Sequence, residues 1–458
     1  MRRLILLLLV LVLPSFAQSK RPFTFEDMMK LKRVGEPVPS PDGKWVLFSV
    51  VDVDLAANTK TPHIWIVELG NQTQGPSTAA KDSQANPSSS LGMTRERMLI
   101  SDQDGDRPRW APDGKRFAFL SNKEKGSQIW IADFDGAGGT VTGVHRLTDV
   151  RTEAAGELWS PDGKNIVFTS DVYPECDGSP AEESTCNAKK LEEREKSKVK
   201  ALIFDRLLYR HWNTYKEGKR SHIFVVPADA CVGTAAPAVR PGEAGQPAAS
   251  DDRSRASGQP VTSDKTRAPL DRTAGGGCPH VNPRDLTPGD YESPVFSLGG
   301  QDNYAFSPDG KELCYTSNHD KVEATSTNND LWTVPVNVGT AASAVRSGEA
   351  GQNPVELRST RQPGAAVATQ SPSDYVSEVL AQTKNITADN PASDSTPLYS
   401  PDGKYIAYRA QQRPGYESDQ FRLSVYERAT GKRRDVLGPT LGDWVGTFIW
   451  TPDSQKIF

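Results

Sequence analysis

A short turn of the form Ser/Ala/Thr-Pro-Asp-Gly-Lys recurs along this chain of 458 residues, and it constrains the fold more than any other feature. The Pro-Asp pairs of five copies stand at 41–42, 112–113, 161–162, 308–309 and 401–402, and a sixth copy at 452–453 has Ser-Gln in place of Gly-Lys. Proline sets φ for the first central position of a tight turn, aspartate bonds to nearby backbone, and glycine takes the position with positive φ. Each copy therefore predicts a hairpin turn, followed by an apolar strand such as 45–51 or 165–169.

Further strand-like segments follow most copies of the turn, as in "QIWIADF" at 128–134 and "DLWTVPV" at 330–336. A unit of three or four short antiparallel strands, repeated about every fifty residues where no insert intervenes, is typical of propeller blades. A sandwich would not need the same turn at the same phase of each unit. We predict an all-β propeller over 18–458 with six blade starts, and about seven blades in the full protein, with eight as the alternative.

An aromatic residue precedes most of the turns at one phase of the repeat. Because the phase is constant, we predict that these residues fill the core between blades and are not stacking platforms for a ligand. They are Trp110, Trp159, Phe306, Tyr399 and Trp450.

Low-complexity segments account for the longer spacings between turns, at about 71–92, 228–279 and 338–382. The second and third contain near-copies of one stretch, "VGTAAPAVRPGEAGQ" and "VGTAASAVRSGEAGQ". Segments rich in Ala, Gly, Pro and Ser bury too little apolar surface to fold alone. We predict that the first is a loop and that the two related inserts are disordered surface loops, with use as a docking motif as the alternative for these two.

The first seventeen residues have the pattern of a signal peptide, with an Arg pair, the apolar run "LILLLLVLVL" and small residues before Gln18. We predict cleavage after Ala17, export to the periplasm or the exterior, and no membrane span after cleavage; a retained anchor is the alternative. The formal net charge of -4 leaves no basic footprint for nucleic acid.

Five cysteines suit an exported protein that can form disulfides. Cys176 and Cys186 could close one bridge and Cys231 and Cys278 another, although four cysteines allow three connectivities. Cys314 lies in the strand-like "ELCYTS" and is predicted to be a buried free thiol.

No cofactor or metal site is predicted from the spacing of residues. The alternating acids Asp102, Asp104 and Asp106 invite a calcium interpretation, but Gly105 comes one place too early for an EF-hand loop. Neither the cysteines nor the histidines have zinc spacing. The charged stretch 189–208 has helical spacing and predicts a short exposed helix inserted into a blade.

The repeated turn with its "xIWxV" strands resembles the propellers of TolB-type periplasmic proteins and of the prolyl oligopeptidase family of serine peptidases. Two less common stretches, 197–226 and 284–318, are similar to the dipeptidyl-peptidase V and acylaminoacyl-peptidase branch of that family, as is the opening 23–50. The resemblance implies the propeller of an exported serine peptidase that hydrolyses short peptides and gates access to its own carboxy-terminal α/β-hydrolase domain. A non-enzymatic TolB-like propeller that binds protein partners is the alternative.

The catalytic residues implied by the resemblance are absent from this chain. It contains no Gly-x-Ser-x-Gly elbow, so no triad is assigned, and the triad is expected beyond Phe458. The chain alone is therefore expected to be inactive.

The resemblance also implies that the propeller supplies groups that hold the peptide, and the unusual insertion "RLLYRHWN" is the candidate for that role. Its cationic, aromatic and hydrogen-bonding side chains are Arg206, Tyr209, Arg210, His211 and Trp212. The alternative is an edge strand or helix packed on the propeller, with Tyr209 and Trp212 as core residues.

Overall fold

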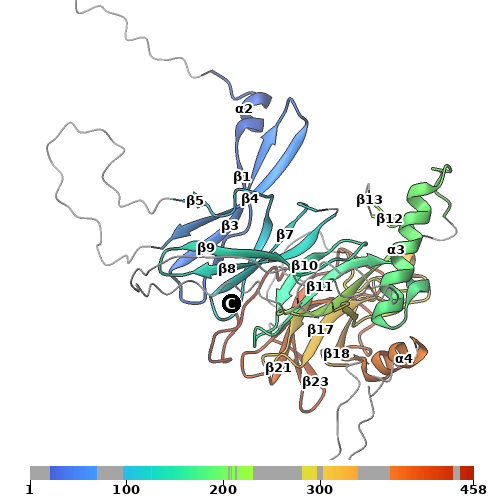
Figure 1. The fold of residues 1–458 in the computed structure, drawn as a ribbon. Helices are drawn as coiled ribbons and strands as arrows, with labels where there is room; N and C mark the ends of the chain where they lie inside the picture. The colour runs from blue at the N-terminus through green and yellow to red at the C-terminus, as the bar shows by residue number, and fades with distance from the viewer. Residues whose placement is uncertain are drawn as a thin grey trace, which may run out of the picture.

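The computed structural model describes residues 21–69, 96–124, 126–204, 207, 209–211, 214–230, 281–296, 303–338, 372–436 and 444–458. Within them the chain is an all-β propeller made of antiparallel sheets, each formed by strands that are consecutive in its blade (Figure 1). The predicted signal peptide, Cys231, Cys278, Arg206 and Trp212 lie outside the described residues.

Five sheets form the blades of the described chain. Blade one contains β1 (Arg33–Val34), β2 (Val38–Pro39), β3 (Trp45–Asp54), β4 (Thr59–Glu68) and β5 (Arg97–Met98). Blade two contains β6 (Asp106–Trp110), β7 (Arg116–Ser121), β8 (Gln128–Asp135) and β9 (Thr140–Arg146). Blade three contains β10 (Ala155–Trp159), β11 (Asn165–Val172), β14 (Arg220–Pro227) and β15 (Arg284–Asp285). Blade four contains β16 (Tyr304–Phe306), β17 (Glu312–Ser317), β18 (Asp330–Pro335) and β19 (Lys384–Asn385). Blade five contains β20 (Asp394–Tyr399), β21 (Tyr405–Ala410), β22 (Arg422–Glu427) and β23 (Lys432–Asp435). A bridge between Trp450 and Ile457 opens a sixth unit.

The remaining elements lie outside the blades. They are α2 (Phe25–Lys30), η1 (Pro174–Cys176), α3 (Pro180–Lys196), the two-stranded hairpin of β12 (Arg210–His211) and β13 (Thr214–Tyr215), η2 (Glu323–Thr325) and α4 (Pro372–Gln382). No described helix is both long and apolar enough to span a lipid bilayer.

The repeated turn forms the predicted hairpin between the first two long strands of a blade. In blade one the Gly43 amide donates to the Ser40 carbonyl at 2.9 Å, and Gly43 has a φ of 69°. Asp42 accepts bonds from the Ser40 hydroxyl at 2.6 Å and the Lys44 amide at 3.1 Å, and these bonds lower the pKa of its carboxyl. The sixth copy keeps this conformation with Ser454 at a φ of 60°.

The aromatic residues before the turns lie between neighbouring blades, as predicted. Trp159, at the end of β10, is 6% exposed and packs with Ile129 and Ile131 of blade two. Its indole Nε1 donates to the Arg109 carbonyl of β6 at 3.0 Å, and the Trp110 indole donates in the same way to the Val38 carbonyl at 3.1 Å. Blades two and three are thus each joined to the preceding blade by apolar packing and by a directed hydrogen bond.

A buried carboxyl, that of Glu157, lies on β10, the first strand of blade three. This strand contacts β6, the first strand of blade two. Glu157 is 1% exposed, and neither of its carboxyl oxygens has a hydrogen-bond partner among the described residues. Burial raises the pKa of this carboxyl to about 8, although the nearby Arg107 and Arg109 act in the opposite direction.

Two predicted boundaries are wrong. The third insert was expected to extend to residue 382, but its last part is α4, whose Tyr375 and Val379 are buried in the core between blades three and four. Their i,i+4 spacing puts both on one helix face. The inserted helix was expected over 189–208, but α3 begins at Pro180 and ends at Lys196. Proline suits the first helical position, because the amide it lacks would have no partner there.

We predict that Trp159→Ala lowers the free energy of unfolding by about 3–5 kcal/mol, because it empties an inter-blade site and leaves the Arg109 carbonyl without its donor. Trp444→Ala, at a tryptophan that is 55% exposed, should change it by only about 0.5 kcal/mol. Urea unfolding followed by circular dichroism measures both. Equal losses in the two variants would contradict an inter-blade role for Trp159.

We also predict that Glu157 makes stability depend on pH. The folded chain keeps this carboxyl protonated up to a pKa of about 8, whereas the unfolded chain ionises near 4.5, so stability falls as pH rises between these values. Glu157→Gln stays neutral, so the wild type should lose up to about 1.4 kcal/mol per pH unit relative to this variant between pH 5 and 8. Urea unfolding at both pH values checks this, with the exposed Glu193→Gln as control. Parallel pH profiles for wild type and Glu157→Gln would exclude the effect.

Candidate functional site

Blade three departs from the repeat, because a long insertion separates its second and third strands. The insertion contains η1, α3 and the β12–β13 hairpin, and it lies on one flank of the propeller (Figure 1). A disulfide joins Cys176 at the end of η1 to Cys186 on α3, which is the first of the two pairs predicted from the sequence. Cys314 is a buried free thiol on β17, as expected.

Of the five sequence-predicted substrate residues, the structure describes three, at the start of the β12–β13 hairpin: Tyr209, Arg210 and His211. Tyr209 is half-buried and stacks with Phe204 and Tyr215, with ring centroids 4.5 Å and 6.3 Å away. Arg210 is exposed and pairs in register with Tyr215, and His211 pairs with Thr214.

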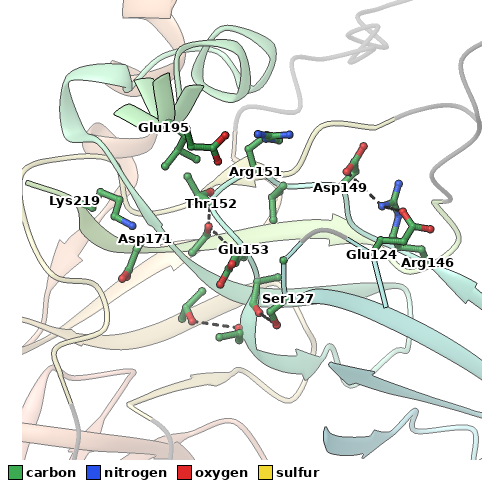
Figure 2. Close-up of a pocket in the computed structure, with 17 residues that line it drawn as sticks. Glu124, Ser127, Arg146, Asp149, Arg151, Thr152, Glu153, Asp171, Glu195 and Lys219 are labelled. Atoms are coloured by element: carbon green, nitrogen blue, oxygen red, sulfur yellow. Dashed lines mark hydrogen bonds and ion pairs between the residues drawn. The ribbon is translucent and has the colours of Figure 1, made fainter. Parts of the chain in front are cut away.

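A hollow of about 570 Å³ lies beside this insertion, between blades two and three and the end of α3 (Figure 2). Neither Tyr209 nor Arg210 lines it. Its floor comes from β11 and from the loop that joins β9 to β10, and Leu191 and Glu195 of α3 form one wall. The charged residues around it are Glu124, Arg146, Asp149, Arg151, Glu153, Asp171, Glu195 and Lys219.

Hydrogen bonds hold the loop that forms the floor. The Ser170 hydroxyl donates to the Glu153 carbonyl at 2.6 Å, and the Ser127 hydroxyl donates to the Ala154 carbonyl at 2.8 Å. The buried Gln128 amide donates to the Val150 carbonyl at 2.8 Å. Side chains on this loop therefore stand on a backbone that is already ordered without a ligand, which reduces the entropy cost of binding.

Most charges around the hollow are already paired. Arg146 forms ion pairs with Glu124 and Asp149, and Lys216 donates to Asp171 at 2.8 Å. Burial alone would lower the pKa of Lys216, but the Glu292 and Asp171 carboxylates raise it overall.

Glu153 differs from these residues. Its side chain is exposed, next to Gly126, and has no hydrogen-bond or ion-pair partner in the described part of the chain. Figure 2 shows it near the centre of the hollow, between Asp171 and Ser127. A carboxylate on a rigid loop, with other acids nearby, can bind an ammonium group.

The sequence did not predict this hollow. The "RTEAAGE" loop at 151–157 carries no motif, and the charged residues come from segments that only the packing of two blades and a helix brings together.

No known family profile matches the chain, but individual relatives do. It is 25% identical over 448 residues to dipeptidyl-peptidase 5 of Porphyromonas gingivalis, which covers 95% of this chain and 45% of that protein. It is 28% identical over 151 residues to a Bacillus subtilis protein described as an uncharacterized peptidase, covering 33% of this chain and 19% of the relative. Among solved structures, an acylaminoacyl peptidase of Pyrococcus horikoshii matches with 11% identity and a TM-score of 0.47, covering 91% of this chain and 41% of that one.

The chain spans about half the length of the dipeptidyl-peptidase 5 sequences that it matches. The match to the Porphyromonas gingivalis protein runs through every described blade, so it is not a likeness of single repeats. The chain is therefore related to the dipeptidyl-peptidase 5 branch of the prolyl oligopeptidase family and corresponds to the β-propeller portion of such a peptidase.

Proposed function

We propose that this chain is the substrate-gating propeller of an exported serine-type peptidase that hydrolyses short peptides. The observation that carries the proposal is the relationship to dipeptidyl-peptidase 5 along 95% of the chain. The reaction would be acyl transfer from a peptide bond to a serine and then to water, in a hydrolase domain outside these residues. The propeller would position the peptide and keep bulk water away from the reacting bond.

The Cys176–Cys186 disulfide supports the export part of the proposal. Disulfides of this kind persist in oxidising compartments such as the periplasm and the exterior, and they are rare in a reducing cytosol. The signal-like residues 1–17 point the same way.

The hollow between blades two and three would hold the amino end of the peptide. Glu153 would accept hydrogen bonds from the ammonium group. Arg151 and Lys219 stand at the rim, where a peptide carbonyl could approach them.

We predict that the protein expressed from its full natural reading frame reacts with a fluorophosphonate probe, which labels activated serines. Peptide mapping should place the label on a serine outside the present 458 residues, because none of the serines here stands in a nucleophile elbow. A full-length product that ends soon after one more blade and stays unlabelled would contradict the peptidase proposal and favour a TolB-like binding propeller.

In the same full-length protein we predict that Glu153→Gln raises KM for a dipeptidyl substrate by about three- to tenfold, as expected for the loss of roughly 1 kcal/mol of ion pairing. The value of kcat should change little, because the residue is assigned to binding alone. Glu193→Gln, at an exposed site on α3, is the matched control. A substrate with an acetylated amino end should be cleaved equally by wild type and variant; an unchanged KM for the free-amine substrate would refute the role of Glu153.

A further inference from the structure

A second cluster of charged residues is buried beneath the insertion, and it does not line the hollow described above. Asp177 follows the disulfide-linked Cys176, Glu183 is on α3, His222 is on β14 and Asp285 is on β15. One oxygen or nitrogen atom from each of these four residues lies within 4.8 Å of those of the other three. The insertion and two strands of blade three therefore converge on one small polar centre.

His222 is oriented at this centre by a backbone bond. Its ring is fully buried, and Nε2 lies 2.8 Å from the Gly289 carbonyl oxygen, to which it can donate. Nδ1 then faces the carboxylates and is 2.6 Å from Asp285 Oδ2. A ring held through one nitrogen by a backbone carbonyl, with the other nitrogen turned to carboxylates, is the arrangement of a histidine that binds a metal.

Two carboxyl oxygens in the cluster lack hydrogen-bond partners. Glu183 is 3% exposed, and its Oε1 has no hydrogen-bond partner among the described residues. Oδ1 of the half-buried Asp177 also has no hydrogen-bond partner there, and it lies 4.0 Å from His222 Nδ1. Unpaired buried carboxyl oxygens are costly, because burial removes their hydration without replacing it. These two atoms point to a ligand that completes the centre.

The charge balance of the cluster points to a cation. Three carboxyl groups share the cluster with one imidazole, and no ion pair joins Asp177 or Glu183 to a Lys or Arg among the described residues. A bound divalent cation would interact favourably with all of these groups.

We propose that Asp177, Glu183, His222 and Asp285 bind a divalent transition-metal cation of the Zn²⁺ class. One imidazole nitrogen and three carboxylates form a four-ligand set that suits Zn²⁺, whereas Ca²⁺ requires six to eight oxygen ligands. Binding replaces the proton between His222 Nδ1 and Asp285 and any protons on Asp177 and Glu183, which pass to solvent. All four positions are taken by protein groups, so the site is structural, and it ties α3 and the disulfide loop to blade three.

The first measurement uses the tag-free full-length chain as purified, after gel filtration. We expect about one equivalent of Zn²⁺ per chain by mass spectrometry of the metal content, its loss after treatment with a chelator, and a rise in melting temperature when Zn²⁺ is restored. Retained Ca²⁺ or Mg²⁺ in place of Zn²⁺ would overturn the assignment. The absence of any bound metal, together with a melting temperature that Zn²⁺ does not change, would overturn the site itself.

Variants then locate the site. Glu183→Gln and Asp177→Asn should each weaken Zn²⁺ binding by about tenfold or more in calorimetric titration. Glu193→Gln, on the same helix but exposed, should bind as the wild type does. Unchanged Zn²⁺ affinity in both ligand variants would place the metal elsewhere and refute the proposal. If a variant does not fold, the metal content and melting temperatures of the wild type decide alone.

Discussion

The structure depends on the contact between each blade and the one before it. At that contact an aromatic side chain from the end of a first strand fills the space between two sheets, and in blades two and three its indole donates to a backbone carbonyl of the preceding blade. The apolar packing is not directional, but the hydrogen bond fixes the height and rotation of one sheet on the next. The turns follow directly and also touch: a Cβ on Gly163 would lie 3.6 Å from Cδ of Pro112, and one on Gly310 the same distance from Pro161. One short repeat therefore encodes both the hairpin and its place in the ring.

This is why the sequence predicted the blades well and the rest less well. The repeated turn and the aromatic residue before it occur at the same position of each unit. They therefore predict the same local structure in every blade. The insertions obey no such repeat. The charge pattern after Lys189 suggested a helix there, but helix formation was decided upstream by Pro180 and by the disulfide that fixes Cys186. At the end of the third insert, Tyr375 and Val379 were overlooked because low-complexity neighbours surround them, yet both are buried. The hollow and the His222 cluster could not be predicted, since their residues are joined only by the packing of strands far apart in the sequence.

The insertion in blade three concentrates the unusual chemistry of the chain. Repeating blades bury mainly apolar side chains and pair their backbone groups, although single acids such as Glu157 and Asp394 are buried in them. Next to the insertion, Glu183 and Asp285 are almost fully buried, and Arg220, which is 8% exposed, bonds to Asp290 and Glu323. Buried charges are poor at adding stability compared with apolar packing, but they are sensitive to the position of their partners. They therefore help to specify where the inserted segment lies on the propeller.

The position of α3 also connects the buried cluster to the hollow. The amino-terminal part of the helix is fixed by the Cys176–Cys186 bridge, by the bond from the Tyr173 amide to Asn187 at 2.9 Å, and by Glu183 at the cluster. Its carboxy-terminal part contributes Leu191 and Glu195 to the wall of the hollow. A helix moves nearly as a rigid rod over this length, so a shift at Glu183 is carried to Glu195 three turns later. The hollow would need the side chain of Glu195 held in place to bind a peptide. The cluster around His222 would hold it through α3, although the cluster does not line the hollow.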